Sequence, residues 1–80
     1  MADSIKDLLS AIVSVLVDNP QDIDIKSLHS ERALIFELKV HSQDLGKVIG
    51  KKGKTAQAIR TLLESACGKI KKRCILEIIG

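Results

Sequence analysis

The chain has 80 residues, of which 45% are hydrophobic and 29% charged, the balance of a folded domain with a modest core rather than of a disordered chain. We therefore expect residues 1–80 to form a single domain. Phe36 is the only aromatic residue, which argues against proteins that stack nucleic-acid bases on aromatic side chains. The N-terminus lacks the basic segment of a signal peptide, and no apolar run approaches the roughly 20 residues that span a bilayer. We expect a cytoplasmic protein with no membrane partner.

Charge is divided unevenly between the two halves of the chain. Residues 1–40 carry four basic and seven acidic side chains, a net charge of −3, whereas residues 41–80 carry nine basic and three acidic ones, a net charge of +6. A basic half beside an acidic half suggests a polyanion site confined to one face. A basic surface that is merely solvated remains an alternative on charge alone.

The two cysteines, Cys67 and Cys74, are separated by six residues. They form no Cys-x-x-Cys pair and no histidine lies near them, so we expect no zinc or other metal site. Buried free thiols are the expected state in a reducing cytoplasm.

The N-terminal segment predicts an amphipathic helix. Ser4 can cap it, and Asn19-Pro20 ends it. Apolar residues recur at helical spacing between these two points and predict one broad buried stripe, made of Ile5, Leu8, Leu9, Ile12, Val13, Leu16 and Val17.

Two strands are predicted next. Residues 22–28 alternate loosely between polar and apolar, and residues 34–41 alternate more strictly. Because only the polar connection 29–32 separates them, we expect an antiparallel hairpin. The second strand is expected to face the core with Leu34, Phe36, Leu38 and Val40.

The C-terminal half predicts two helices and a final strand. Ser42 is expected to cap a short helix over about residues 43–49, which the segment Gly50–Gly53 interrupts. A longer helix ends near Gly68. Its inner side is expected to carry Ala56, Ile59, Leu62, Leu63, Ala66 and Cys67. A strand over 73–79 follows, with Cys74, Leu76 and Ile78 pointing inward.

The predicted order is αββααβ, which makes an α+β domain with three helices on one face of a three-stranded mixed sheet. The last strand is expected to run parallel to its neighbour, because two helices separate them in sequence. The outer sheet face then carries Ile35, Ile75 and Ile79, either as scattered surface aliphatics or as a dimer contact.

The segment from Leu45 to Thr55 carries the clearest functional pattern. Gly50 and Gly53 stand three residues apart between two helices, where the backbone can turn sharply and approach a ligand. The first amides of the following helix form an anion site. Four lysines and no acidic residue surround them, at positions Lys47, Lys51, Lys52 and Lys54.

Two other interpretations compete for this segment. Gly53-Lys54-Thr55 ends like a nucleotide-binding P-loop, but the first glycine of that motif would fall on Val48, and a P-loop follows a strand rather than a helix. A plain helix–helix turn with solvated lysines explains the glycines but not the concentration of basic residues.

The segment Val48-Ile49-Gly50-Lys51-Lys52-Gly53, continued by apolar Ala56 and Ile59, resembles the signature of the KH domain. The αββααβ order resembles the type II KH fold over essentially the whole chain. The chain looks most similar to the small bacterial single-KH RNA-binding proteins of the KhpA type.

This resemblance implies a groove for about four unpaired nucleotides of single-stranded RNA. Its Gly-x-x-Gly loop would hold the sugar-phosphate backbone, and bases would lie on an aliphatic floor. The RNA-binding residues that the resemblance and the pattern together indicate are Lys47, Ile49, Gly50, Lys51, Lys52, Gly53, Lys54, Thr55, Ala56, Ile59 and Arg60.

Ala56 is smaller than the aliphatic residue that many KH domains carry at its position, and the connection 29–32 is short, so we expect low sequence selectivity. A second basic cluster over residues 69–73 could extend the RNA path or stabilise the C-terminus of the preceding helix.

The sequence shows no catalytic constellation, so we expect neither an enzyme nor a small-molecule substrate or cofactor. The resemblance implies a homodimer, or a heterodimer with a larger KH-containing protein, and a role as post-transcriptional regulator or RNA chaperone. A protein-interaction KH module with little RNA binding is the alternative.

Overall fold

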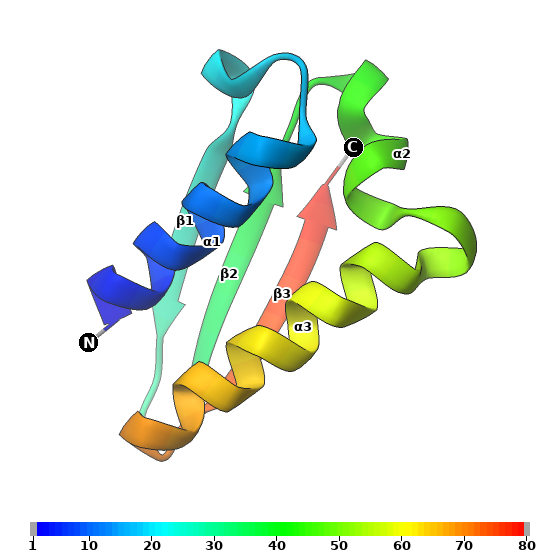
Figure 1. Cartoon of the computed structure of the whole chain (residues 1–80). Helices are drawn as coiled ribbons and strands as arrows, with labels where there is room; N and C mark the ends of the chain where they lie inside the picture. The colour runs from blue at the N-terminus through cyan, green and yellow to red at the C-terminus, as the bar shows by residue number, and fades with distance from the viewer. Residues whose placement is uncertain (1, 80) are drawn as a thin grey trace.

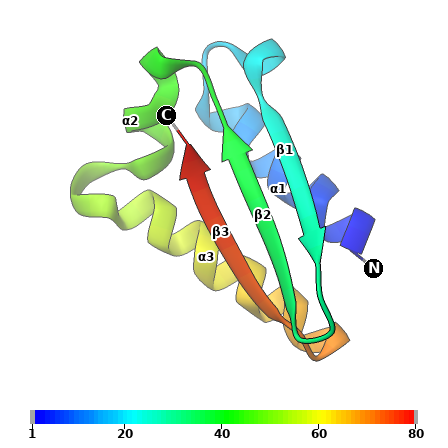
Figure 2. The ribbon, with the colours of Figure 1, turned by 180° about the vertical axis from the view of Figure 1, so that it is seen from behind.

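Three helices and three strands form two layers in the computed structural model, which describes residues 2–79 and the side chains from Ser4 onward. The helices are α1 (Ala2–Leu16), α2 (Leu45–Ile49) and α3 (Lys54–Cys67); the strands are β1 (Asp24–His29), β2 (Ala33–Lys39) and β3 (Arg73–Ile79). The helices cover one face of the sheet (Figure 1), and within the described residues its other face carries no helix (Figure 2). The predicted α+β class and αββααβ order are confirmed.

The sheet has the order β1-β2-β3, with β2 in the centre. β1 pairs antiparallel with β2, which confirms the predicted hairpin. β3 pairs parallel with β2, as expected for strands joined through two helices. β3 is therefore an edge strand that lies beside α2 and α3 (Figure 1).

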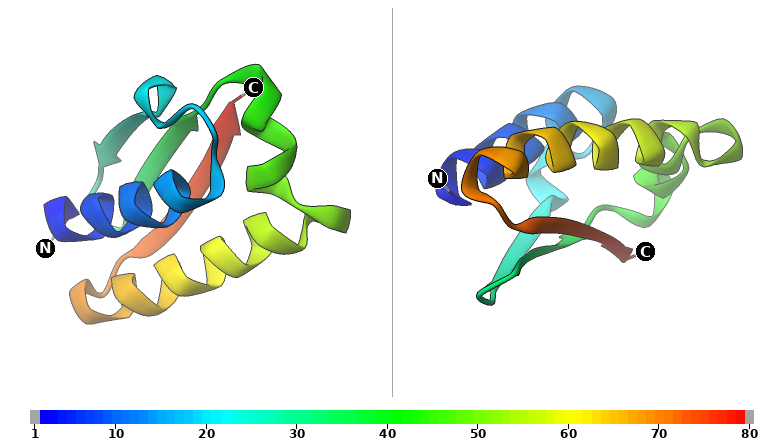
Figure 3. Two further views of the ribbon diagram at one scale, coloured as in Figure 1. Left: turned by 45° about the horizontal axis from the view of Figure 1, so that its top comes forward. Right: turned by 90° about the horizontal axis from the view of Figure 1, so that it is seen from below.

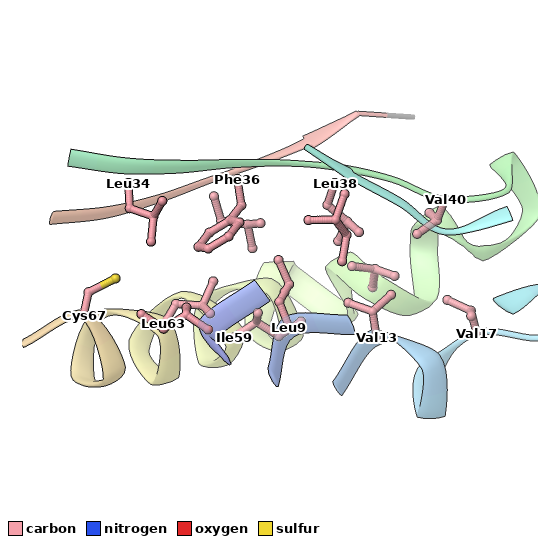
Figure 4. Close-up of a cluster of buried hydrophobic side chains, with 14 residues drawn as sticks. Leu9, Val13, Val17, Leu34, Phe36, Leu38, Val40, Ile59, Leu63 and Cys67 are labelled. Carbon is pink, nitrogen blue, oxygen red and sulfur yellow. The ribbon is translucent and has the colours of Figure 1, made fainter. Parts of the chain in front are cut away.

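The core lies between the two layers and is almost entirely aliphatic. Four alternating side chains of the central strand and its extension point toward the helices, namely Leu34, Phe36, Leu38 and Val40 (Figure 4). They face Leu9, Val13 and Val17 from α1 and Ile59, Leu63 and Cys67 from α3. All of them are buried, so the alternation in residues 34–41 is confirmed as the inner face of a strand.

Two predicted core residues lie at the surface instead. The side chain of Leu8 is 41% exposed and that of Leu62 is 54% exposed. α1 and α3 lie side by side over the sheet (Figure 3), so each helix buries a narrower stripe than its apolar residues suggested. Leu8 and Leu62 fall on the flanks of these stripes.

Both predicted serine caps are wrong. α1 begins at Ala2, so Ser4 lies inside its first turn. Ser42 is the first residue of a short 3₁₀ turn, Ser42–Asp44, that precedes α2. The side chain of His41 caps this turn, since its Nδ1 accepts a hydrogen bond from the Gln43 N–H at 3.0 Å.

The prediction of free thiols is also wrong, because the structure joins Cys67 and Cys74 in a disulfide. Cys67 ends α3 and Cys74 is the second residue of β3. The turn between them includes Lys71 in a left-handed conformation (φ 57°), which reverses the chain. Their Cα atoms are thereby 6.0 Å apart, an ordinary separation for a disulfide.

Candidate nucleic-acid interface

The segment Gly50–Gly53 forms the turn between α2 and α3, and it projects beyond the edge strand β3 (Figure 1). Gly50 has φ 79° and ψ 172°, a region that is essentially restricted to glycine. A Cβ atom at Gly50 would lie 2.1 Å from Thr55 Oγ1 and 2.8 Å from the Thr55 backbone nitrogen. Gly50 and Thr55 therefore pack against each other, and this contact sets the shape of the turn.

The next residues of the turn also have positive φ. Lys52 adopts φ 57° and Gly53 φ 74°, both in the left-handed region. For a lysine this conformation costs about 1–2 kcal/mol relative to the right-handed one. A Cβ atom at Gly53, unlike one at Gly50, would meet no other atom within 4 Å. The turn thus presents its Gly53 side, and the exposed side chains of Lys51 and Lys52, to solvent.

The N-terminus of α3 carries an unusual concentration of positive charge. Gly53 occupies the N-cap position, and no side chain caps the helix. The first turn contains no acidic residue, and Lys51, Lys52 and Lys54 surround it instead. Cations at this end of a helix are unfavourable, by roughly 0.3–1 kcal/mol each, because they oppose the helix dipole. The lack of a side-chain cap and the three lysines together favour an anion at this position.

Lys47 is placed differently from the other lysines. Its ammonium group forms an ion pair with Asp18, in the loop after α1, and lies 3.8 Å from Asp44 Oδ1. The hydrogen bond to Asp18 raises the pKa of Lys47, while partial burial opposes the shift. Lys47 thus has protein partners, whereas no ion pair among the described residues involves Lys51, Lys52 or Lys54.

Asp44 is a structural residue that the sequence pattern did not reveal. Its carboxylate is buried and accepts hydrogen bonds from the backbone N–H groups of Asp18 and Asn19, at 3.2 and 3.0 Å. It also accepts one from Asn19 Nδ2 at 3.1 Å. Burial by itself raises the pKa of Asp44, but these hydrogen bonds and the charge of Lys47 together lower it. Asp44 thereby fastens the start of α2 to the loop that follows α1.

Replacing Asp44 with asparagine is expected to lower stability in a pH-dependent way. A carboxylate whose pKa is lowered on folding stabilises the protein above its unfolded pKa, near 3.8, and this contribution is lost as the pH falls through the folded pKa. Urea unfolding of wild type and Asp44→Asn should therefore differ at neutral pH and converge as the pH falls below the lowered pKa of the folded state. An equal difference at neutral pH and below that pKa would contradict this role of the carboxylate.

The predicted apolar floor is largely buried. Ala56 and Ile59 are only 3% and 2% exposed, and Ile59 belongs to the hydrophobic core. Ile49, at the end of α2, is 37% exposed. Of the three, Ile49 offers the most surface to a base, while Ala56 and Ile59 hold α3 against the sheet.

Arg60 lies between α3 and the edge strand. Its Nη2 donates a hydrogen bond to the Leu76 carbonyl oxygen of β3 at 3.4 Å. Gln57 and Glu64, three residues before and four residues after it, share this side of the helix and are exposed. This side of α3 and the backbone of β3 therefore face each other next to the Gly50–Gly53 turn.

The second basic cluster does not lie on the last turn of α3, which contains no basic residue. Lys69 lies in the 3₁₀ turn Gly68–Ile70, and Lys71 and Lys72 follow it before β3 begins at Arg73. These lysines directly follow the C-terminus of α3, where cations are favourable, so both interpretations of the cluster stay open. They lie at the opposite end of α3 from the Gly50–Gly53 turn (Figure 1).

Comparison with known proteins agrees with this geometry. The model of the KH domain of KhpA and KhpB matches residues 6–78, which include all three strands except the last residue of β3. The chain belongs to the KhpA/KhpB KH-domain family. The fold is thus the type II KH fold that the order of elements predicted, and the resemblance seen in the sequence is confirmed.

Relatives of this family are similar to almost the whole chain. RNA-binding protein KhpA of Caldanaerobacter subterraneus is 51% identical over 73 residues, which are 91% of this chain and 97% of that protein. The KhpA proteins of Clostridium perfringens and Aquifex aeolicus are 45% and 40% identical, over 92% and 95% of this chain and 99% and 96% of those proteins. No solved structure matches the chain significantly.

The names of these relatives describe RNA-binding proteins and not enzymes, in agreement with the prediction that the chain is not an enzyme. Among the described residues, no cluster of three histidine, cysteine or acidic side chains is arranged to hold a metal ion. The helices of residues 2–79 are too short or too polar to cross a membrane.

Proposed function

We propose that this chain is a cytoplasmic protein whose residues 1–80 act as one KH domain that binds single-stranded RNA. The observation that carries the proposal is the electrostatically unfavourable arrangement at the start of α3, where Lys51, Lys52 and Lys54 surround an uncapped helix N-terminus. An RNA phosphate would relieve the repulsion among these charges and accept hydrogen bonds from the lysine ammonium groups. The name of the KhpA relatives agrees with this ligand.

Each site residue receives a role from its place in the fold. Gly50 and Thr55 shape the turn, Gly53 allows the RNA backbone to approach, and Lys51, Lys52 and Lys54 supply charge. Ile49 contacts a base, and the buried Ala56 and Ile59 hold α3 in place. Arg60 lines the side that faces β3, and Lys47 positions α2 rather than binding phosphate. With so little exposed apolar surface and a short 29–32 connection, the groove binds RNA with low sequence selectivity, which suits a post-transcriptional regulator or RNA chaperone.

Removing the two loop charges tests this proposal. We expect Lys51→Gln/Lys52→Asn to bind a fluorescent single-stranded RNA pool at least about tenfold more weakly than wild type, because two phosphate contacts are lost. The slope of log affinity against log salt concentration should also become shallower, by about 0.7 for each lost contact. Asparagine suits the left-handed backbone at position 52. Anisotropy at two salt concentrations measures both quantities, and circular dichroism verifies the fold.

The matched control is Lys26→Gln/Lys39→Gln, which removes two exposed charges from the sheet. It should bind RNA nearly as well as wild type. If the two double variants lose affinity equally, binding depends on overall charge and not on the loop. If wild type does not bind RNA, the alternative of a protein-interaction module takes the place of this proposal.

We also propose that the chain forms a homodimer, or a heterodimer with a larger KH-containing protein. Exposed aliphatic residues support this on two faces. Leu8 and Leu62 lie on the helical layer, where Leu8 borders an apolar hollow with Ile5 and Ala66. Leu28 lies on the sheet and is 52% exposed.

Light scattering of Leu62→Glu and Leu28→Glu should show a monomer for one of them. A wild type that is monomeric at high concentration would exclude the homodimer.

A further inference from the structure

A polar hollow lies at the far end of α3 from the Gly50–Gly53 turn. It has a volume of about 350 Å³ and is lined by Glu64, Lys72, Arg73 and Cys74. It is formed where the last turns of α3 meet the start of β3, near the lower end of the molecule in Figure 1. This volume is within the range of small-ligand sites.

One exposed side of α3 connects the Gly50–Gly53 turn to this hollow. Gln57, Arg60 and Glu64 lie one above another on that side, because they are spaced three and four residues apart. The hydrogen bond from Arg60 to the Leu76 carbonyl oxygen shows that this side faces β3. Between Lys54 and Glu64 the helix rises about 15 Å. A single-stranded RNA whose backbone is held by the turn can therefore follow α3 to the hollow.

The charges in the hollow have no partners within the described part of the chain. No ion pair and no side-chain hydrogen bond there involves Glu64, Lys72 or Arg73. The Arg73 backbone is held in place, since its N–H donates to the Arg32 carbonyl oxygen at 2.9 Å. Two cations beside one carboxylate complement a nucleotide, which offers an anionic phosphate and, on most bases, an amino group that donates hydrogen bonds.

We propose that this hollow binds one further nucleotide of the RNA whose backbone the Gly50–Gly53 turn holds, an inference that rests on the proposed function. Lys72 and Arg73 bind its phosphate, and Glu64 accepts a hydrogen bond from the exocyclic amino group of cytosine, adenine or guanine. Uracil lacks this group, and its N3–H lies between two carbonyl oxygens that a carboxylate repels. The site therefore extends beyond four nucleotides and disfavours uracil at its far end.

Short and long oligonucleotides separate this hollow from the rest of the groove. The dissociation constants of fluorescein-labelled oligocytidines of four and eight nucleotides, and of an eight-nucleotide oligouridine, are measured by anisotropy. A longer oligonucleotide also gains affinity by offering more registers. The ratio of the four-nucleotide to the eight-nucleotide dissociation constant is therefore compared among variants. For Arg73→Gln we expect this ratio to fall about fivefold, with the four-nucleotide affinity unchanged.

Glu64→Gln should instead reduce the preference for oligocytidine over oligouridine at eight nucleotides by about fivefold, because glutamine can also donate to uracil. The charge control Lys26→Gln, on exposed β1, should leave both ratios unchanged. If both hollow variants keep the wild-type ratios while the four-nucleotide strand still binds, the hollow is no RNA site and the proposed function stands. If wild type binds neither length, both proposals fail.

Discussion

Gly50→Ala is expected to lower the free energy of unfolding by about 3 kcal/mol, the upper range for strain in a backbone region that only glycine occupies readily. The new methyl group would also overlap Thr55, whose backbone nitrogen it would approach to 2.8 Å. The turn must therefore distort, and α2 must shift relative to α3. Urea unfolding followed by circular dichroism measures the loss.

Gly46→Ala is the control for this change. Gly46 lies in α2, and a Cβ atom there would meet nothing within 4 Å. Alanine at an exposed helical position should be neutral or stabilise the protein by up to about 1 kcal/mol. A Gly50→Ala variant as stable as Gly46→Ala would show that the contact with Thr55 does not shape the turn.

Gly53→Ala is expected to weaken RNA binding by about tenfold or more while the protein stays folded, because any group between the helix amides and a phosphate lengthens charge-assisted hydrogen bonds. The left-handed backbone at Gly53 costs alanine about 1–2 kcal/mol, but no neighbouring atom obstructs the methyl group. Stability is measured by thermal unfolding and affinity by anisotropy with single-stranded RNA.

Gly68→Ala provides the comparison at the other end of α3. Its φ is −57° and its Cβ position is open, so both fold and RNA affinity should remain as in wild type. If Gly53→Ala binds RNA as tightly as Gly68→Ala does, the RNA backbone does not pass over Gly53. Together these variants separate the roles that we propose for the two glycines of the turn, Gly50 in the fold and Gly53 at the ligand.

The parts of the fold that depend on residues close together in the sequence could be predicted from the sequence. Alternation over residues 34–41 identified the inner face of β2, and the loop residues Gly50–Gly53 are contiguous, so their position between two helices was visible. The exposure of Leu62 could not be predicted from the sequence, because it depends on where α1 lies beside α3. A helical stripe shows which residues share a side but not how far the neighbouring layer covers it.

Contacts between distant segments were also beyond the sequence. Asp44 accepts hydrogen bonds from residues 25 and 26 positions earlier, and this places Lys47 beside Asp18, with which it forms an ion pair. The disulfide depends on a chain reversal at Lys71, a residue type that rarely adopts a left-handed conformation. The sequence therefore revealed neither the disulfide nor the ion pair of Lys47 with Asp18.

Backbone amide shifts of isotopically labelled protein during titration with an oligocytidine test whether RNA binds at the Gly50–Gly53 turn. We expect the largest changes at Lys51, Lys52, Gly53 and the first turn of α3, with smaller ones along the side of α3 that faces β3. Amides of β1, on the far edge of the sheet, should hardly move. Large shifts confined to β1 and the outer sheet face, with the turn unchanged, would show that RNA binds elsewhere.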